Sequence, residues 1–410
     1  MSRLPFFFIL TGIIGFVLFQ IASLSSLTGW LGEELRSPGG WFHAHLFVLG
    51  WATSLAMGAV YQLINVITQS AIYSERLGYV NYVCFTIGLC GLLYGFMDGE
   101  IYWIAGSAGL LLIGILLFGW NIGVTLIRAR AWNPVTISAA CSVLYLVLTG
   151  LTGMGMGLNF AGGWMLDAHE SLFGAHIWMG TIGWFGLLIT GFSYKMLPMF
   201  YLAHDYPEKL QTVVLLLWNA SVLAGALSFF IDSNAILLRL ALLMLVAAVL
   251  LYNVHLLQIK RKRHKRHPGS GIQASVYANQ AFACMLTLML VYACLYPDRM
   301  LNSGPITVAG WLYLGGWVSF TILSYASKIV PFLWWTHKYG KQAGKPGTPL
   351  MAHLLDEKKV RIGLAAIGLA SLALLAGLAI GSSTLISLSG TILSLFSIAY
   401  MAIIGLVFTR

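Results

Sequence analysis

Residues 172–200 read LFGAHIWMGTIGWFGLLITGFSYKMLPMF, a run in which Lys195 is the only side chain with a full charge at neutral pH. Roughly 20 consecutive apolar residues are enough to cross the hydrocarbon core of a bilayer as a helix. Inside lipid a segment must satisfy its backbone N–H and C=O groups internally, and a helix does so. This run therefore predicts a transmembrane helix, and similar runs follow one another along the chain.

The composition supports the same interpretation. Of the 410 residues, 59% are hydrophobic and 9% are charged, and the mean hydropathy is +0.84. Soluble domains are about 25% charged, so a soluble enzyme and a disordered chain are excluded. The five cysteines lie in apolar runs without a CxxC pair, which excludes a disulfide framework and a zinc knuckle. We predict an all-α, polytopic membrane protein that forms a single membrane domain over residues 1–410.

The apolar runs between clusters of charged and turn residues predict about 12 transmembrane helices. The first run has no clear small-residue cleavage site and is as long as the others, so we interpret it as a helix and not as a signal peptide. The predicted spans are 4–26, 43–67, 79–97, 102–126, 134–158, 172–200, 211–230, 235–258, 275–296, 305–335, 361–381 and 384–408.

Basic side chains gather in alternate loops, above all in the run KRKRHKRH at residues 260–267. Because cytoplasmic loops collect Lys and Arg, this asymmetry predicts a multi-pass protein of the cell membrane with both termini in the cytoplasm. Residues 259–274 and 337–360 are then cytoplasmic loops. The net charge of +10 reflects topology and contact with membrane lipid head groups, not a nucleic-acid partner. The opposite loops hold Arg36 and Arg299 against the acidic residues Glu33, Glu34, Asp98, Glu100, Asp167, Glu170, Asp232 and Asp298.

A Gly-Trp pair recurs in the second, sixth and tenth predicted spans. Its tryptophans are Trp51, Trp184 and Trp317, which are 133 residues apart in both intervals. Two equal intervals predict three repeats of four helices, at about 1–133, 134–266 and 267–399. An even number of helices per repeat makes the copies parallel, so we expect a pseudo-threefold axis along the membrane normal.

Four histidines lie at or inside the outer ends of these repeated helices: His43, His45, His169 and His176. His43 and His176 each precede the repeated tryptophan by eight residues. His43 and His45 point about 200° apart on a helix, whereas His169 and His176 share one face about 10 Å apart. An imidazole inside a span suggests a functional site and is a ligand for iron or copper. For His43, His45 and His169, hydration at the membrane surface is the alternative interpretation.

Two stretches resemble a known family. Twelve helices in three four-helix repeats resemble the heme-copper oxidase subunit I superfamily, which includes the nitric oxide reductases. Phe42–Trp51 (FHAHLFVLGW) resembles the second helix of that superfamily, where a histidine ligates the low-spin heme, and resembles equally the His-Ala-His opening of the NnrS family. Phe173–His176 (FGAH) resembles the sixth helix, which supplies a copper ligand in the oxidases.

The chain also departs from that pattern. Residues 212–219 (TVVLLLWN) in the seventh span lack a His-His pair, and residues 310–317 (GWLYLGGW) in the tenth lack histidine. The resemblance therefore implies a protein without the complete copper and catalytic-heme ligand set. It implies heme b held by His43 or His45 together with His176, and leaves copper possible at His176 with His169. A small gas ligand, NO or O2, and a homo-oligomer or a respiratory partner protein follow from the same resemblance.

Other charged residues lie near the cytoplasmic ends of the predicted spans and in the loops. Lys195 and Lys328 occupy equivalent positions near the cytoplasmic ends of the sixth and tenth spans. They either extend along the helix to reach the membrane surface or form an entry point for protons or anions. We interpret Asp205, Glu208, Asp356 and Glu357 as isolated loop charges. We place His255 at the inner end of its helix and expect the histidines in inner loops to be solvated, namely His204, His264, His267, His337 and His353.

Three functions remain open at this point. The first is a heme-binding membrane protein in nitric oxide response or respiratory-chain support; if it is an enzyme, it is an oxidoreductase acting through heme. The second is a transporter or handling protein for heme, copper or another metal. The third is a divergent terminal oxidase or nitric oxide reductase subunit, which the missing histidines disfavour.

Overall fold

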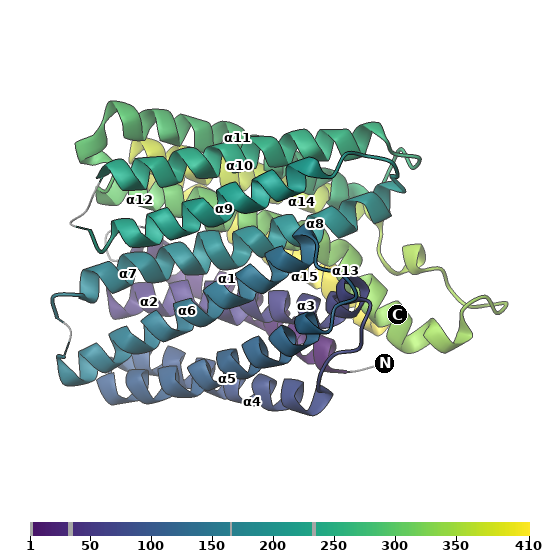
Figure 1. The fold of residues 1–410 in the computed structure, drawn as a ribbon, viewed down its shortest axis with the longest axis horizontal. Coiled ribbons are helices and arrows are strands. Elements are labelled where there is room, and N and C mark those ends of the chain that lie inside the picture. The colour runs from purple at the N-terminus through teal and green to yellow at the C-terminus, as the bar shows by residue number, and fades with distance from the viewer. Residues whose placement is uncertain (1–2, 32–35, 165, 232–234) are drawn as a thin grey trace. The chain divides into compact units, whose positions relative to one another are not determined.

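A computed structural model describes residues 3–31, 36–164, 166–231 and 235–410 (Figure 1). Over these ranges the chain is all-helical, with a single isolated β-bridge and no strand. Three of the acidic residues assigned to the outer loops, Glu33, Glu34 and Asp232, lie outside the described residues.

Within the described residues, 12 helices are long and apolar enough to cross a membrane. This number confirms the all-α, multi-pass prediction. The spans are Leu4–Leu24, Pro38–Thr68, Glu75–Asp98, Ile101–Ile127, Pro134–Gly162, His169–Tyr201, Lys209–Ser228, Ile236–Arg261, Ser270–Leu295, Ser303–Gln342, Glu357–Ile380 and Ser383–Thr409.

The chain divides into two compact units. The first comprises Met1–Gln62, His267–Phe282 and Leu301–Arg410, and the second comprises Leu63–Arg266 and Ala283–Met300. Helices α3 (Ser54–Thr68) and α11 (Ser270–Leu295) contribute residues to both. The first unit holds α1 (Leu4–Leu31), α2 (Pro38–His45), α12 (Ser303–Gly310), α13 (Phe320–Tyr339), α14 (Glu357–Ile380) and α15 (Ser383–Gly405). The second holds α4 (Glu75–Asp98), α5 (Ile101–Ile127), α6 (Pro134–Gly162), α7 (His169–Trp178), α8 (Leu187–Tyr201), α9 (Lys209–Ser228) and α10 (Ala235–Arg261).

Three of the spans change from α-helical to π-helical geometry along their length. The π-helical segments are η1 (Leu46–Thr53), η2 (Met179–Gly186) and η4 (Trp311–Ser319). Each contains one of the repeated Gly-Trp pairs, and the tryptophans of all three pairs are fully buried. Such segments are rare and frequent at functional sites. Hydropathy did not predict them, but the Gly-Trp spacing marks where they lie; the threefold repeat itself stays a prediction.

Tryptophans and glycines interlock around η2 in the second unit. Trp218 on α9 donates its indole N–H to the carbonyl of Ile182, at 2.8 Å. A Cβ added to Gly186 would lie 2.5 Å from the Trp218 ring, so only glycine leaves room for it. In return, Trp178 of α7 fills the space beside Gly225 of α9 and donates to a backbone carbonyl of that helix. Small residues let helices approach closely in a membrane. These two contacts therefore fix α9 against the span His169–Tyr201, to which α7 and η2 belong.

Helices α4 and α5 run side by side as an antiparallel pair (Figure 1). A Cβ on Gly88 would collide with the backbone of Leu111, and one on Gly114 would lie 2.7 Å from the backbone of Phe85. Asn81 donates its amide to the carbonyl of Gly114 at 2.8 Å. Backbone contact at glycines and a buried side-chain amide therefore contribute to holding the pair together.

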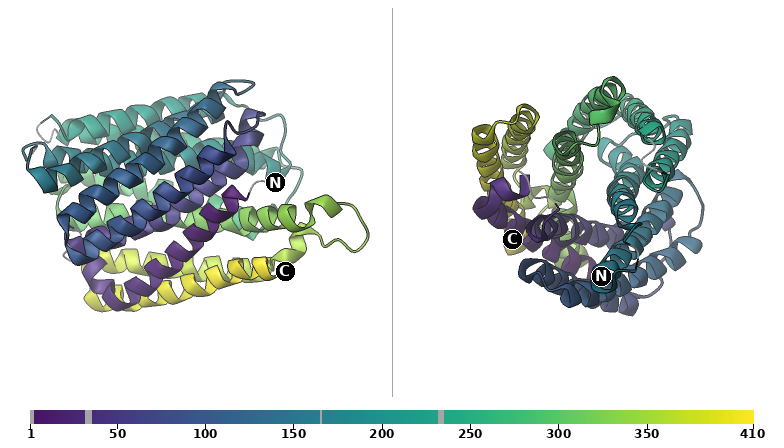
Figure 2. Two further views of the ribbon diagram at one scale, coloured as in Figure 1. Left: turned by 90° about the horizontal axis from the view of Figure 1, so that it is seen from below. Right: turned by 90° about the vertical axis from the view of Figure 1, so that its left-hand side faces the viewer.

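Close contacts at glycines and buried polar hydrogen bonds also hold the helices of the first unit together. Helices α14 and α15 lie side by side, and α1 packs against α15 (Figure 2). A Cβ on Gly15 of α1 would collide with the carbonyl of Gly50, so α1 touches the backbone of η1 directly. The ring of Phe16 lies 4.3 Å from that of Trp51, between centroids. Buried Tyr400 of α15 donates its hydroxyl to the carbonyl of Leu323 on α13, at 3.1 Å.

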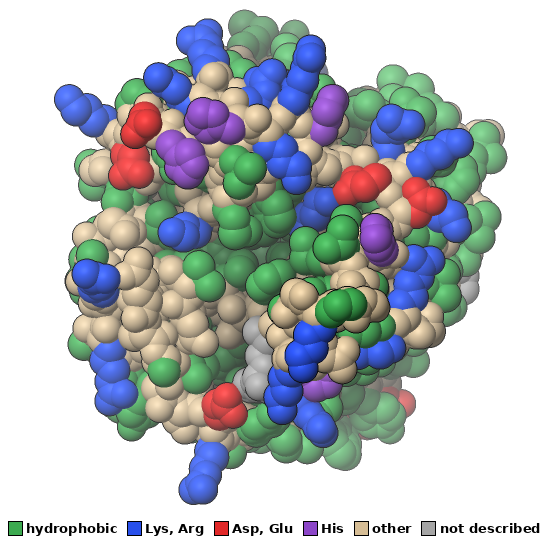
Figure 3. All heavy atoms as spheres, turned by 90° about the vertical axis from the view of Figure 1, so that its right-hand side faces the viewer, with side chains coloured by type: hydrophobic (Ala, Val, Ile, Leu, Met, Phe, Trp, Pro, Cys, Tyr) green, Lys and Arg blue, Asp and Glu red, His purple; other side chains and the backbone are tan. Residues whose placement is uncertain are grey.

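The helix ends define the basic loops more narrowly than the sequence did. Helix α10 ends at Arg261 and α11 begins at Ser270, within the predicted loop 259–274. Helix α13 ends at Tyr339 and α14 begins at Glu357, within the predicted loop 337–360. Lys and Arg side chains gather on the face drawn in Figure 3, with histidines among them.

We expect Gly186→Ala to destabilise the protein, because its methyl group would displace the Trp218 indole and disturb the bond to the Ile182 carbonyl. Overpacking of this kind costs about 1–3 kcal/mol, so the apparent melting temperature in detergent should fall. Gly106→Ala on α5 is the matched control, because nothing lies within 4 Å of a Cβ there. Equal melting temperatures for the two variants would contradict the packing described.

Candidate functional site

His43 and His45 both lie on α2, directly before η1. This short helix begins with Ser37, whose hydroxyl accepts the backbone N–H of Gly40 at 3.1 Å, and with Pro38 at its first position. Both features favour a helix start. The two histidines therefore occupy the last turn of a regular α-helix, where residues two apart point to different sides.

Each of these imidazoles is anchored through Nδ1 to its own helix. Nδ1 of His43 lies 2.8 Å from the carbonyl oxygen of Gly39, and Nδ1 of His45 lies 2.8 Å from that of Trp41. A carbonyl can only accept, so Nδ1 carries the hydrogen in both rings. In the neutral imidazole the lone pair is then on Nε2.

His176 on α7 is anchored in the same sense, but to a neighbouring helix. Its Nδ1 donates to the carbonyl of Thr149 on α6 at 2.9 Å, and the hydroxyl of Thr152 lies 3.3 Å away. A Cβ on Gly153 would lie 2.9 Å from Cε1 of the imidazole, so this glycine makes room for the ring against α6. The lone pair of the neutral ring is again on Nε2.

His169 is arranged in the opposite sense. The side-chain amide of Asn159 donates to Nδ1 of His169 at 3.0 Å, so the hydrogen of the neutral ring is on Nε2. The ring also meets Phe160 edge-on, at 4.9 Å between centroids. His169 and His176 both bond to α6, as expected for histidines seven residues apart on one helix face.

Three of the four imidazoles have the second hydrogen-bond partner that metal-binding histidines usually have. Metal-binding histidines usually donate one ring nitrogen to a carbonyl or carboxylate, which orients the ring and raises the basicity of the other nitrogen. His43, His45 and His176 show this arrangement, and His169 does not. Across the described ranges, no group of three or more His, Cys, Asp or Glu side chains could share a metal ion. Heme needs only one or two such imidazoles.

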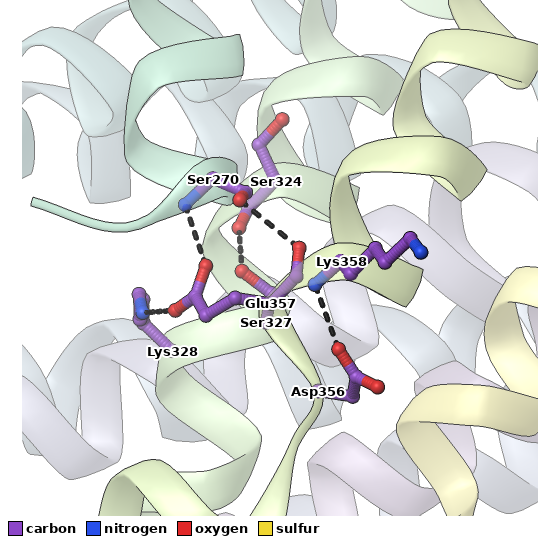
Figure 4. Close-up of polar contacts among 7 residues, drawn as sticks. All are labelled: Ser270, Ser324, Ser327, Lys328, Asp356, Glu357 and Lys358. Carbon is purple, nitrogen blue, oxygen red and sulfur yellow. Dashed lines mark hydrogen bonds and ion pairs between the residues drawn. The ribbon is translucent and has the colours of Figure 1, made fainter. Parts of the chain in front are cut away.

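The two candidate lysines differ. Lys195 on α8 is exposed, whereas the Lys328 side chain on α13 is 16% exposed and forms an ion pair with Glu357 (Figure 4). The Glu357 carboxylate also accepts the backbone N–H of Ser270, at 2.7 Å. The interpretation of Glu357 as an isolated loop charge is therefore wrong: it is the first residue of α14 and joins α13 to the start of α11.

Local backbone geometry makes this ion pair possible. Gly269 has a φ of +117°, and a Cβ there would collide with the end of the Lys328 side chain. Asp356 precedes α14 and accepts the backbone N–H of Lys358 at 2.8 Å (Figure 4). It also accepts the backbone N–H of Lys359, at 3.4 Å. These hydrogen bonds favour the ionised carboxylate and lower the pKa of Asp356. Asp356 is thus the cap of α14, not an isolated charge.

The sequence interpretation also missed a buried polar cluster around His255 of α10 in the second unit. His255 is fully buried, and its Nε2 accepts the side-chain amide of Gln211 at 3.1 Å. The rings of Tyr194 and Tyr206 meet it edge-on, at 5.2 and 5.8 Å between centroids. Burial raises the pKa of Tyr206. Only the placement of polar residues inside apolar runs hinted at this cluster, and their partners depend on the tertiary fold.

Comparisons with known proteins add no relative. Neither a protein-family model nor a curated protein matches the chain. The resemblance to the heme-copper oxidase superfamily and to the NnrS family therefore rests on the residues quoted above, and stays a prediction.

We expect Glu357→Gln and Lys328→Met each to lower the apparent melting temperature, because each leaves one member of a partly buried ion pair uncompensated. The loss of stability in the double variant should be smaller than the sum of the losses in the two single variants, by a coupling energy of about 1 kcal/mol. Lys195→Met is the control and should change little, since Lys195 is exposed. Strictly additive effects in the double variant would show that the pair does not stabilise the fold.

Proposed function

We propose that this chain is a heme-binding integral membrane protein of the heme-copper oxidase subunit I or NnrS type. It holds heme b and acts in nitric oxide response or respiratory-chain support, not in full oxygen reduction. One observation carries the proposal: three imidazoles of the second and sixth spans are each fixed through Nδ1 by a backbone carbonyl, which directs basicity to Nε2.

The roles of the residues follow from their anchors. His176 of the sixth span would hold the heme iron, together with either His43 or His45 of the second span. The last two point to different sides of α2, so one site can use only one of them. Heme, when bound, would supply an iron that accepts imidazole nitrogen and that would bind a small gas such as NO or O2 when one of the two imidazole positions is vacant. The chain's own contribution is to orient the imidazoles and to place the lone pair of each neutral ring on Nε2.

The π-helical segments support a functional role for these helices. Segments η1 and η2 begin within three residues of His43 and His176, and π-helical turns are frequent at functional sites. Their recurrence with the Gly-Trp pairs also supports three four-helix repeats related by an axis along the membrane normal. A copper ion at His176 with His169 is less well supported, because the Nδ1 lone pair of His169 already accepts a hydrogen bond.

The proposed orientation in the membrane rests on the loop charges. Basic residues crowd the loop 262–269 and lie within and beside the loop 340–356, and such loops stay in the cytoplasm next to anionic lipid. Both termini then lie in the cytoplasm of a cell-membrane protein. The anchored histidines lie at the opposite ends of their helices, in the outer leaflet.

We expect His176→Ala to abolish or grossly alter bound heme b, since an axial ligand is a single nitrogen that water or a neighbouring side chain does not replace. Of the two variants His43→Ala and His45→Ala, one should likewise lose or alter the bound heme, and the other should keep it. The measurement is heme stoichiometry in the purified protein together with its reduced-minus-oxidised spectrum.

His169→Ala is the matched control for the ligand test. It removes an imidazole from the same helix, but one whose Nδ1 is already a hydrogen-bond acceptor, so heme content should stay at the wild-type level. An unchanged spectrum and stoichiometry in the His176 variant would count decisively against the proposal.

For orientation, we expect a cysteine placed at Lys262 in a cysteine-free background to resist an impermeant maleimide in intact cells. A cysteine placed at Asp167, in the loop before α7, should react. Both positions are exposed, so the difference reports on the side of the membrane and not on burial. Labelling of the Lys262 position from outside would reverse the proposed topology.

A further inference from the structure

Two histidines that neither the fold nor the proposed heme site uses lie close together in the second unit. His204 follows α8, and His264 follows α10. Their ring centroids are 5.8 Å apart, and the ring planes are inclined by 38°. Both side chains are exposed; Lys and Arg flank His264, whereas residues 202–208 around His204 contain neither. The sequence alone gave no reason to pair them, because they are far apart in the chain.

Backbone contacts hold the two histidines in this arrangement. Ala203 and Arg263 form an isolated antiparallel bridge. The backbone N–H of Lys265 donates to the carbonyl of Tyr201 at 2.9 Å, and that of His264 donates to the carbonyl of Leu202 at 3.4 Å. The imidazoles therefore stand on two segments that are cross-linked at the residues next to them.

The turn that carries His204 adopts a costly conformation. Leu202 and Asp205 have φ values of +51° and +56°, in the left-handed region. A bulky residue such as leucine is rarely found there, because its backbone is strained in that region. Such strain persists only where the surrounding contacts determine the backbone, so the position of His204 is set by the fold.

We propose that His204 and His264 bind a divalent first-row transition-metal ion between their rings. Zinc–imidazole bonds are about 2.0–2.1 Å long, so two imidazoles that share one ion have ring centroids roughly 5–6 Å apart. The observed separation fits this geometry. Imidazole is a preferred ligand of Zn²⁺, Cu²⁺ and Ni²⁺, whereas Mg²⁺ and Ca²⁺ prefer oxygen. Water completes the coordination at this exposed position.

The surrounding charges set how this site depends on salt. Asp205 and Glu208 lie near His204 in the sequence, but Lys262, Arg263, Lys265 and Arg266 flank His264. Their excess positive charge repels a cation, and salt screens such repulsion over about 10 Å at 0.1 M. Metal affinity at this site therefore rises with the concentration of a non-coordinating salt. An ion held only by carboxylates would show the opposite trend.

Metal bound here would connect the segments that follow α8 and α10. An ion that binds only the folded chain stabilises it in proportion to its occupancy. The site is independent of the proposed heme ligands, because neither of its histidines belongs to that set. Failure of one proposal therefore leaves the other standing.

The test is a titration of the EDTA-treated, purified full-length protein with Zn²⁺ by calorimetry, and with Cu²⁺ by electron paramagnetic resonance. We expect a site that Mg²⁺ does not occupy, a copper signal with two imidazole nitrogens, and tighter Zn²⁺ binding in about 500 mM than in about 20 mM sodium perchlorate. His204→Ala and His264→Ala should each weaken Zn²⁺ binding roughly tenfold or more, since loss of even an outer partner of a metal ligand costs 10- to 100-fold.

Matched controls come from other exposed histidines. His267→Ala and His353→Ala change the histidine count without touching the pair, and should leave this site intact. Unchanged elution from a sizing column shows that each variant is folded. The proposal is overturned if the wild-type protein binds no Zn²⁺ below about 1 mM, a dissociation constant that corresponds to −4.1 kcal/mol. It is also overturned if the control variants lose as much affinity as His204→Ala and His264→Ala.

Discussion

Every backbone carbonyl in a membrane span needs a donor, and this constraint organises the structure. A regular α-helix meets it alone. Where a span becomes π-helical the pattern of donors changes, and in η2 the chain supplies an extra one: the indole of Trp218 reaches the carbonyl of Ile182. Gly186 exists as glycine so that this indole can approach. This indole and the packing of Trp178 against Gly225 together hold α9 against the sixth span.

The proposed heme ligands depend on the same carbonyls. His43 and His45 donate to carbonyls one turn earlier in their own helix, and His176 donates to α6. In each case a group that already belongs to the helical ladder uses its second lone pair to fix an imidazole. The backbone carbonyl therefore determines which ring nitrogen carries the hydrogen. His169 shows the contrast, because a side-chain amide donates to it instead and the hydrogen moves to the other nitrogen.

The sequence was most informative where a property depends on local composition. Hydropathy predicted the 12 spans, because each must be apolar along its own length. The Gly-Trp spacing located the three π-helical segments without revealing their geometry. The pairing of Lys328 with Glu357 was missed, because it joins residues 29 positions apart across a turn that only the fold defines. The tautomers of His169 and His176 were equally out of reach, since Asn159 and Thr149 become neighbours only when α6 and α7 pack together.

The π-helical segments also limit what a helical wheel can say about this protein. An α-helix turns by 100° per residue, and a π-helix, with its longer hydrogen-bonded loop, turns by less. Residues after η2 are therefore rotated about the helix axis by less than a continuous α-helix would rotate them relative to the residues before it. His176 and Lys195 belong to one continuous span, yet no single wheel describes both. Each half of such a span has its own angular frame, and substitutions in one half must be planned without reference to the faces of the other.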